Sequence, residues 1–246
     1  MKDTDVVILG GARTPMAEYN GHFAEIPETE LGAHAARAAL EKAGVSPDWI
    51  HHTVFGNALQ TSPNAIYGAR HVALKAGIPV DRPALTVNRI CGSGLQSIVT
   101  AGHLIRLAEA EVVLAGGMEN MSMAPYVLRS VRSGWPKLGA GKMEDALLAA
   151  LLDSHSGCTM ADTAENLAHD MDIPRLAMDE YAVRSQECAN AFHASGRAAE
   201  EIVPVEVPQR RGPLVVADDD HRRPGTTIEA LGRLRPAFRK DGVVTG

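Results

Sequence analysis

The fold is decided by the stretch Val87-Asn88-Arg89-Ile90-Cys91-Gly92-Ser93-Gly94-Leu95, in which an apolar strand turns into a helix. A thiol at a helix N-terminus lies at the positive end of the helix dipole, near unpaired backbone N–H groups, and both stabilise a thiolate. Gly92 and Gly94 let an acyl group approach the backbone, and the N–H of Cys91 can stabilise a developing oxyanion. These residues favour Cys91 as a nucleophile; a small buried apolar side chain at a tight turn is the open alternative.

Strand and helix patterns alternate on both sides of this stretch. The apolar run Val6–Leu9 is closed by Gly10 and Gly11, and Gly44 follows an Ala-rich helical segment. The expected order is strand at 6–9, helix at 29–43, strand at 53–55, helix at 65–76, strand at 86–88, helix at 92–107 and strand at 111–117. This order predicts an α/β fold with a mixed, mainly parallel sheet, helices on both faces, and a buried strand at 6–9.

The pattern changes after Glu119. Short helices are predicted at 144–152, 163–171 and 178–194, and a small hairpin at 203–207 and 214–216. We expect three parts. Residues 1–119 form the core with the nucleophile, residues 120–235 form an α+β loop domain packed on it, and residues 236–246 return to the core.

Composition excludes several classes of function. The 246 residues carry 24 Lys and Arg against 30 Asp and Glu, a net charge of −6, and only 4% are aromatic. This balance argues against binding nucleic acid or an anionic membrane. Three cysteines are too few for a disulfide framework, and no Cys/His cluster has the spacing of metal ligands. Without a signal-peptide pattern or a membrane-spanning run, we expect a cytoplasmic protein.

Several motifs resemble those of the thiolases, the acyl-CoA acyltransferases that make or cleave 3-oxoacyl-CoA. The resemblance runs over essentially the whole chain, in the family's order, and implies a thiolase-like N-terminal domain with its loop domain. The motifs are Gly10-Gly11-Ala12-Arg13-Thr14-Pro15, Asn88-Arg89-Ile90-Cys91-Gly92-Ser93-Gly94, Ala115-Gly116-Gly117-Met118-Glu119-Asn120-Met121-Ser122, Thr163-Ala164-Glu165-Asn166, Glu201-Ile202-Val203-Pro204 and Leu234-Arg235-Pro236-Ala237-Phe238.

The resemblance implies roles for four positions. Cys91 matches the cysteine that takes the acyl group as a thioester. Leu151 and Met160 match residues that line the pantetheine and acyl pocket, and Arg223 matches a basic residue near the adenine and phosphate end of coenzyme A. Acyl-CoA and coenzyme A are then substrates, and no separate cofactor or metal is implied. The eight Lys and Arg residues from Arg210 onward, against five acidic ones, suit a polyphosphate or form a solvated surface.

The match ends near Gly246, a little past the middle of a family subunit. In the family, a second domain of the same type supplies a Gly-His-Pro histidine, a proton-moving cysteine and an oxyanion-site asparagine. His22 and His103 lack the surroundings of that histidine. Carbon–carbon bond formation needs such a base and stabilisation of enolate charge. We therefore expect a half-subunit without the C-terminal domain, completed by a C-terminal half or partner chain, in a homo-oligomer.

The resemblance leaves substrate and role open. Short-chain biosynthetic members carry a His-Met pair where this chain has Thr159 and Met160, so a longer or broader acyl range is as open as acetoacetyl-CoA. A non-catalytic coenzyme A-binding or assembly subunit and a ketosynthase-like condensing enzyme are the alternatives. The intact motif around Cys91 argues against the first, and the thiolase form of the motifs argues against the second.

Overall fold

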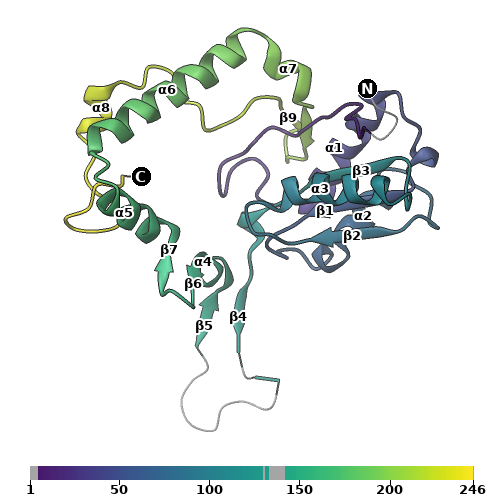
Figure 1. Ribbon diagram of the computed structural model, residues 1–246, viewed down its shortest axis with the longest axis horizontal. Coiled ribbons are helices and arrows are strands. Elements are labelled where there is room, and N and C mark those ends of the chain that lie inside the picture. The colour runs from purple at the N-terminus through teal and green to yellow at the C-terminus, as the bar shows by residue number, and fades with distance from the viewer. Residues whose placement is uncertain (1–4, 130, 133–141, 246) are drawn as a thin grey trace. The chain divides into compact units, whose positions relative to one another are not determined.

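A computed structural model describes residues 5–129, 131–132 and 142–245 of the chain (Figure 1). The chain forms two compact units. The first comprises Met1–Ala124 and Ala199–His221, and the second comprises Pro125–Ala198 and Arg222–Gly246. Within the described ranges, every helix is too short or too polar to cross a bilayer.

The first unit is built on a three-stranded parallel sheet. Its strands lie in the order β2 (Ala84–Val87), β1 (His52–Gly56) and β3 (Val113–Gly117). Thr53 of β1 lies opposite Ala84 of β2 and Leu114 of β3. Because the three strands run in the same direction, their C-terminal ends meet at one edge of the sheet, where α/β proteins place their sites.

Helices cover both faces of this sheet, which confirms the predicted fold class. On one face, α1 (Glu28–Ala43) and α2 (Gly68–Lys75) share an apolar core with Phe55 of β1. On the other face, α3 (Ser93–Arg106) contacts β1 and β3. A side chain at Gly56 would point at the start of this helix. Phe55 and Gly56 point to opposite faces because side chains alternate along a strand.

Most of the predicted elements of the first unit are present. α1 ends at Gly44, which has a left-handed φ of 64° and donates its N–H to the last turn, as the glycine end signal predicts. The predicted hairpin is an antiparallel pair of strands. The remaining elements of this unit are η1 (Pro47–Trp49), η2 (Ala65–Tyr67), η3 (Met121–Met123), β8 (Val205–Val207) and β9 (Leu214–Val216).

The predicted buried strand at 6–9 is wrong. Residues 6–9 belong to no strand, and the side chains of Val7, Ile8 and Leu9 are 51%, 80% and 61% exposed. A continuous apolar run forms a buried strand only where other elements cover it and a neighbouring strand pairs with it. No strand pairs with this run in the part of the chain that the structure describes.

The segment 199–221 packs with the first unit, whereas the sequence predicts one excursion over residues 120–235. Arg13 holds the segment in place. Its N–H donates to the carbonyl oxygen of Glu201 at 2.9 Å, and its carbonyl oxygen accepts from the N–H of Val203 at 2.8 Å. The guanidinium group of Arg13 donates to both carboxylate oxygens of Asp219, at 2.7 and 2.9 Å. The motif at 10–15, which contains Arg13, therefore has a structural role.

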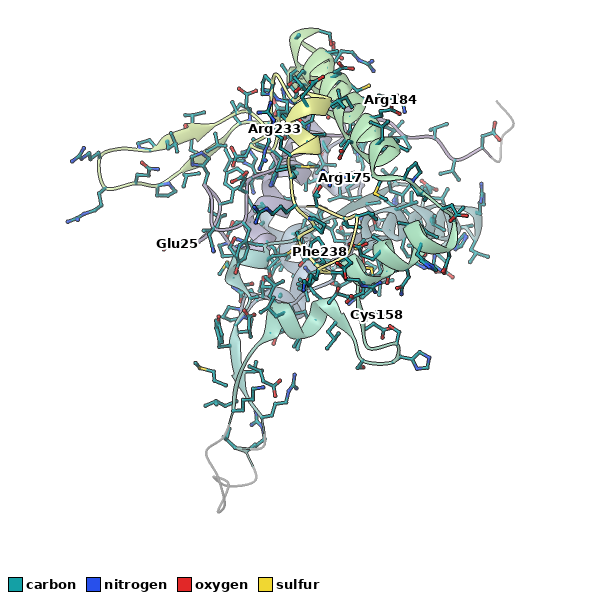
Figure 2. The ribbon with its side chains drawn as sticks, turned by 90° about the vertical axis from the view of Figure 1, so that its left-hand side faces the viewer. Glu25, Cys158, Arg175, Arg184, Arg233 and Phe238 are labelled. Atoms are coloured by element: carbon teal, nitrogen blue, oxygen red, sulfur yellow. The ribbon has the colours of Figure 1, made fainter. Side chains whose placement is uncertain are left out.

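The second unit consists of helices and two short ribbons. Its elements are β4 (Tyr126–Leu128), β5 (Met143–Asp145), α4 (Ala146–Leu151), β6 (Leu152–Asp153), β7 (Cys158–Thr159), α5 (Met160–Asp170), α6 (Arg175–Ala194) and α8 (Ile228–Gly232). α7 (Arg197–Glu201) lies where the chain passes between the units. Arg175, labelled on α6 in Figure 2, donates to the carbonyl oxygens of Leu231 and Leu234, at 2.5 and 3.2 Å. These bonds satisfy one carbonyl group in the last turn of α8 and one just after the helix.

Candidate functional site

Cys91 lies at the strand-to-helix turn that the sequence predicts. It directly precedes Gly92, the residue at the N-terminal cap of α3, and its side chain is exposed to solvent. Within this chain, it is therefore not a buried apolar side chain. Among the described residues, none accepts a hydrogen bond from the N–H groups of Gly94 and Leu95. The first turn of α3 can thus stabilise negative charge near the thiol.

The turn before Cys91 is strained and is held by hydrogen bonds. Ile90 has a φ of 51°, a left-handed conformation that a β-branched residue rarely adopts and that costs about 1–3 kcal/mol. The N–H of Ile90 donates to Asn88 Oδ1 at 2.9 Å, and Ser93 Oγ donates to the carbonyl oxygen of Ile90 at 2.6 Å. Ser93 Oγ also accepts from the N–H of Arg89 at 2.8 Å. Hydrogen bonds therefore hold both the N–H and the carbonyl group of Ile90, and they fix the backbone from which the Cys91 side chain projects.

Two glycines at the ends of β1 and β3 let α3 lie close to the sheet. A Cβ atom on Gly56 would lie 2.7 Å from both the nitrogen of Gly94 and the Cβ of Ser93, closer than real Cβ atoms come. A Cβ on Gly117 would lie 3.3 Å from the Cα of Gly94. Gly117 belongs to a predicted motif, whereas sequence reasoning missed Gly56. The signal that could have identified Gly56 is its place at the end of a buried apolar strand.

Glu119 follows β3 at the same edge of the sheet as Cys91. Its carboxylate accepts hydrogen bonds from the N–H groups of Ala58 and Leu59, at 2.8 and 3.1 Å, and from Asn57 Nδ2 at 3.1 Å. Burial raises the pKa of the Glu119 carboxyl group, and the two backbone amides oppose that rise. Glu119 is part of the motif at 115–122, but the sequence pattern assigns this residue no role. A polar residue directly after a parallel strand is the signal that could have identified it.

Leu151 and Met160 both lie in the second unit, next to a pair of residues that face each other. Leu151 ends α4 and Met160 begins α5. The chain between them forms the antiparallel ribbon of β6 and β7, in which Leu152 lies opposite Thr159. Leu151 and Met160 flank this paired end of the ribbon, on α4 and α5, and they are 45% and 65% exposed. The two helix ends that the ribbon joins therefore expose an apolar pair to solvent.

Arg223 also lies in the second unit, before α8. Its N–H donates to Gln186 Oε1 on α6 at 2.8 Å, and its carbonyl oxygen accepts from Thr226 Oγ1 at 2.7 Å. The backbone is therefore fixed, while the residue itself is exposed. Cys91 belongs to the first unit, so its grouping with the three residues of the second unit in one site stays a prediction.

Thr159, the residue before Met160, caps the N-terminus of α5. Its hydroxyl accepts from the N–H of Asp162 at 3.2 Å and donates to Asp162 Oδ2 at 2.7 Å, and that oxygen also accepts from the N–H of Thr159 at 3.0 Å. This is a reciprocal capping box. Thr159 thus has a structural role besides any contact with substrate.

We expect Thr159→Ala to lower the free energy of unfolding by about 1 kcal/mol, because the substitution removes the cap of α5. Thr159→Ser retains the hydroxyl and should unfold close to the unsubstituted chain. Urea unfolding followed by circular dichroism measures both. Equal unfolding midpoints for the alanine and serine variants would contradict the capping role.

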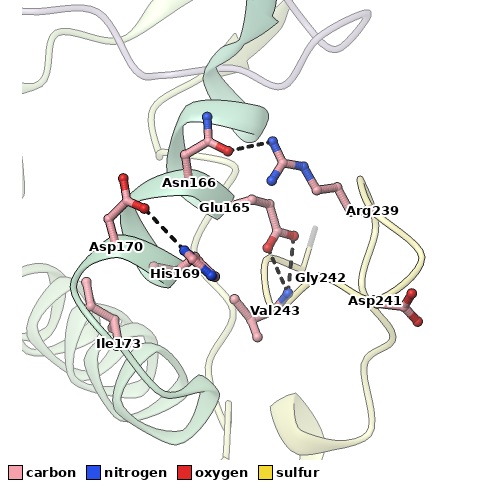
Figure 3. Close-up of a pocket in the computed structure, with 10 residues that line it drawn as sticks. Glu165, Asn166, His169, Asp170, Ile173, Arg239, Asp241, Gly242 and Val243 are labelled. Carbon is pink, nitrogen blue, oxygen red and sulfur yellow. Dashed lines mark hydrogen bonds and ion pairs between the residues drawn. The ribbon is translucent and has the colours of Figure 1, made fainter.

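A cavity of about 490 Å³ lies beside α5 in the second unit (Figure 3). The carboxylate of Glu165, which is only 4% exposed, accepts from the N–H groups of Val243 and Val244 at 2.9 and 3.0 Å. Arg239 donates to Asn166 Oδ1 at 2.8 Å. These bonds tie the segment 239–244 to α5, so the Thr-Ala-Glu-Asn motif has a structural role in this unit.

The fold and the turn define an α/β protein with an exposed cysteine at the N-terminus of a helix, at the C-terminal edge of a parallel sheet. No group of three or more His, Cys, Asp or Glu side chains in the described ranges is placed to hold a metal. The family model for "Thiolase, N-terminal domain" matches residues 6–246. The chain therefore belongs to the thiolase family.

Known proteins similar to this chain include human "3-ketoacyl-CoA thiolase, mitochondrial", 47% identical over 98% of this chain and 60% of the human one. "Acetyl-CoA acetyltransferase" of Cupriavidus necator is 44% identical over 98% of this chain and 62% of its own length. The crystal structure of the human mitochondrial enzyme in complex with CoA matches with a TM-score of 0.90 and 46% identity, covering 96% of this chain and 59% of that one. The chain thus spans about 60% of the length of these relatives.

Proposed function

We propose that this chain is the nucleophile-bearing part of a thiolase, which makes or cleaves 3-oxoacyl-CoA through an acyl thioester on Cys91. One observation carries the proposal: the exposed thiol stands at the N-terminus of α3, after a strained turn that hydrogen bonds hold in place. Membership of the thiolase family favours this function over a ketosynthase-like condensing enzyme.

The first chemical step needs only groups near this turn and a proton acceptor. The Sγ thiolate of Cys91 attacks the carbonyl carbon of the acyl-CoA, and the carbonyl oxygen becomes an oxyanion. The oxyanion collapses, the bond to the sulfur of coenzyme A breaks, and the coenzyme A thiolate leaves and takes up a proton. Backbone N–H groups at the start of α3 favour both negative species.

The substrates in this proposal are acyl-CoA and coenzyme A. The exposed apolar pair Leu151 and Met160 suits the pantetheine and acyl portion. The exposed Arg223, whose backbone is fixed, suits a phosphate group. The structure of the human relative in complex with CoA supports the same ligand for this chain.

The remaining catalytic groups come from a C-terminal half or partner chain in this proposal. Among the described residues, none forms a hydrogen bond with Cys91 Sγ, which leaves room for a base from the other half. Exposed apolar side chains at helical spacing also line one side of α3: Leu95 is 69% exposed, Ile98 45% and Val99 42%. This stripe supports a covering partner, and the family resemblance supports assembly into a homo-oligomer.

We place the chain in a reducing compartment such as the cytoplasm. All three of its cysteines, Cys91, Cys158 and Cys188, are free. A nucleophilic thiol acts only while it is reduced. The name of the human relative assigns that enzyme to mitochondria.

The proposal predicts that acetyl-CoA leaves one acetyl group on the chain: solvent takes the proton of the Cys91 thiol, and the thiolate then displaces coenzyme A without the second half. Incubation followed by peptide mass spectrometry should locate the group on Cys91, and octanoyl-CoA tested in parallel reports the acyl range. A separately expressed C-terminal half of a relative should then restore thiolysis of a 3-oxoacyl-CoA. Binding of coenzyme A without any adduct would instead indicate a non-catalytic binding subunit.

A further inference from the structure

The three loops at the C-terminal edge of the sheet are joined by hydrogen bonds that run from Glu119 toward Cys91. Glu119 follows β3, Ala58 and Leu59 follow β1, and Asn88 follows β2. The loops are far apart in the sequence and meet only because the parallel strands end at one edge.

The first link is the peptide group between Ala58 and Leu59. Its N–H, which belongs to Leu59, donates to Glu119 Oε1 at 3.1 Å, and its carbonyl oxygen, which belongs to Ala58, accepts from Asn88 Nδ2 at 3.0 Å. The N–H of Ala58 also donates to Glu119 Oε2 at 2.8 Å. One peptide group therefore connects the carboxylate to the Asn88 side chain, and bonds in such a chain polarise and strengthen one another.

The second link joins Asn88 to the turn. With its Nδ2 engaged by Ala58, the Asn88 amide is oriented so that Oδ1 accepts from the N–H of Ile90 at 2.9 Å. Ile90 is the residue with a φ of 51° that immediately precedes Cys91. A strained conformation persists only where the surroundings hold it, and this bond is one of those that do.

We propose that Glu119 is a positioning residue for the nucleophile: through the Ala58–Leu59 peptide group and the Asn88 amide, it holds the turn that aims Cys91 at the acyl carbon. The inference rests on the proposed function. Glu119 touches neither Cys91 nor substrate in this role and takes no part in proton transfer. Its partial burial and its three donors favour a fixed geometry for the carboxylate over a mobile surface side chain.

Two substitutions interrupt the chain of bonds at different points. Glu119→Gln replaces one acceptor oxygen with an NH2 group that faces a backbone N–H. Asn88→Asp leaves the acceptor for Ile90 but replaces the donor to Ala58 with an oxygen. Glu111→Gln is the matched control, because Glu111 is an exposed glutamate of the same unit.

The experiment measures two rates at Cys91 in each variant and in the double variant: acylation by acetyl-CoA and alkylation by iodoacetamide. Cys188 alkylation in the same samples is the internal reference, because this exposed cysteine lies in the second unit. We expect each single variant to slow both Cys91 rates about tenfold, the scale of a small misplacement of a reacting atom. The Cys188 rate and the Glu111→Gln rates should stay unchanged.

The double variant distinguishes positioning from a general loss of structure. If Glu119 acts through Asn88, the double variant is slowed no more than about tenfold, whereas independent effects would multiply to about a hundredfold. Multiplying effects, or an unchanged Cys91 rate in Glu119→Gln, would overturn the inference. If the unsubstituted chain takes no acetyl group, the proposed function fails, while the iodoacetamide rates still decide whether Glu119 controls the reactivity of Cys91.

Discussion

Replacing Cys91 with alanine should abolish the acyl adduct and lower the turnover of the chain, combined with a C-terminal half, by at least about 10³-fold. The reason is that alanine leaves no atom that can carry the acyl group between the two substrates. Because the Cys91 side chain is exposed, the variant should fold like the unsubstituted chain. Mass spectrometry of the adduct and a thiolysis assay of the combined halves measure the loss.

Cys158→Ala and Cys188→Ala are the matched controls for that prediction. Cys158 lies in the short strand β7, and Cys188 lies within α6. Cys188 is far from the start of α6, so its thiol gains nothing from the start of a helix dipole. Cys158 directly precedes Thr159, the cap of α5, but it is only partly exposed, and its thiol donates to the carbonyl oxygen of Ser156 at 3.7 Å. Both variants should still form the acyl adduct on Cys91, and both should keep the turnover of the chain combined with a C-terminal half. Undiminished turnover in Cys91→Ala would refute the proposed function.

Gly56→Ala should lower the free energy of unfolding by about 3 kcal/mol, the upper range for forcing an extra carbon into a packed site. The added Cβ would overlap the carbonyl carbon of Ser93 and lie 2.7 Å from the nitrogen of Gly94. Backbone atoms cannot rotate away, so α3 has to move from the sheet. Cys91 moves with the start of α3, and its acylation rate should fall as well. Urea unfolding and the acetyl-CoA adduct rate measure the two effects.

The control for Gly56→Ala is Gly102→Ala, within α3 itself. A Cβ at Gly102 would meet no atom within 4 Å. In a helix interior, alanine is favoured over glycine by about 0.5–1 kcal/mol, so this variant should be slightly more stable than the unsubstituted chain. Equal stability of Gly56→Ala and the unsubstituted chain would show that α3 does not need the close approach.

Local signals predicted most of the first unit. The left-handed end of α1 at Gly44 and the turn from β2 to α3 depend on a few neighbouring residues, so the sequence pattern is sufficient. Where the structure differs from the sequence-based prediction, long-range contacts are the reason. The apolar run at 6–9 shows that apolarity alone does not make a strand, because a strand also needs a partner. The place of 199–221 in the first unit depends on the bonds that Arg13 forms with Glu201, Val203 and Asp219.

The candidate site also has one part that the sequence predicted and another that depends on long-range contacts. By itself, the sequence determined that a cysteine stands where a strand becomes a helix, since strand, turn and helix signals are contiguous there. Only the tertiary structure decided that Gly56 brings α3 against the sheet and that Glu119 connects through Ala58 and Asn88 to the turn before Cys91. Those residues come from loops distant in the sequence. They meet because β1, β2 and β3 are parallel and in a particular register, which no short stretch of sequence contains.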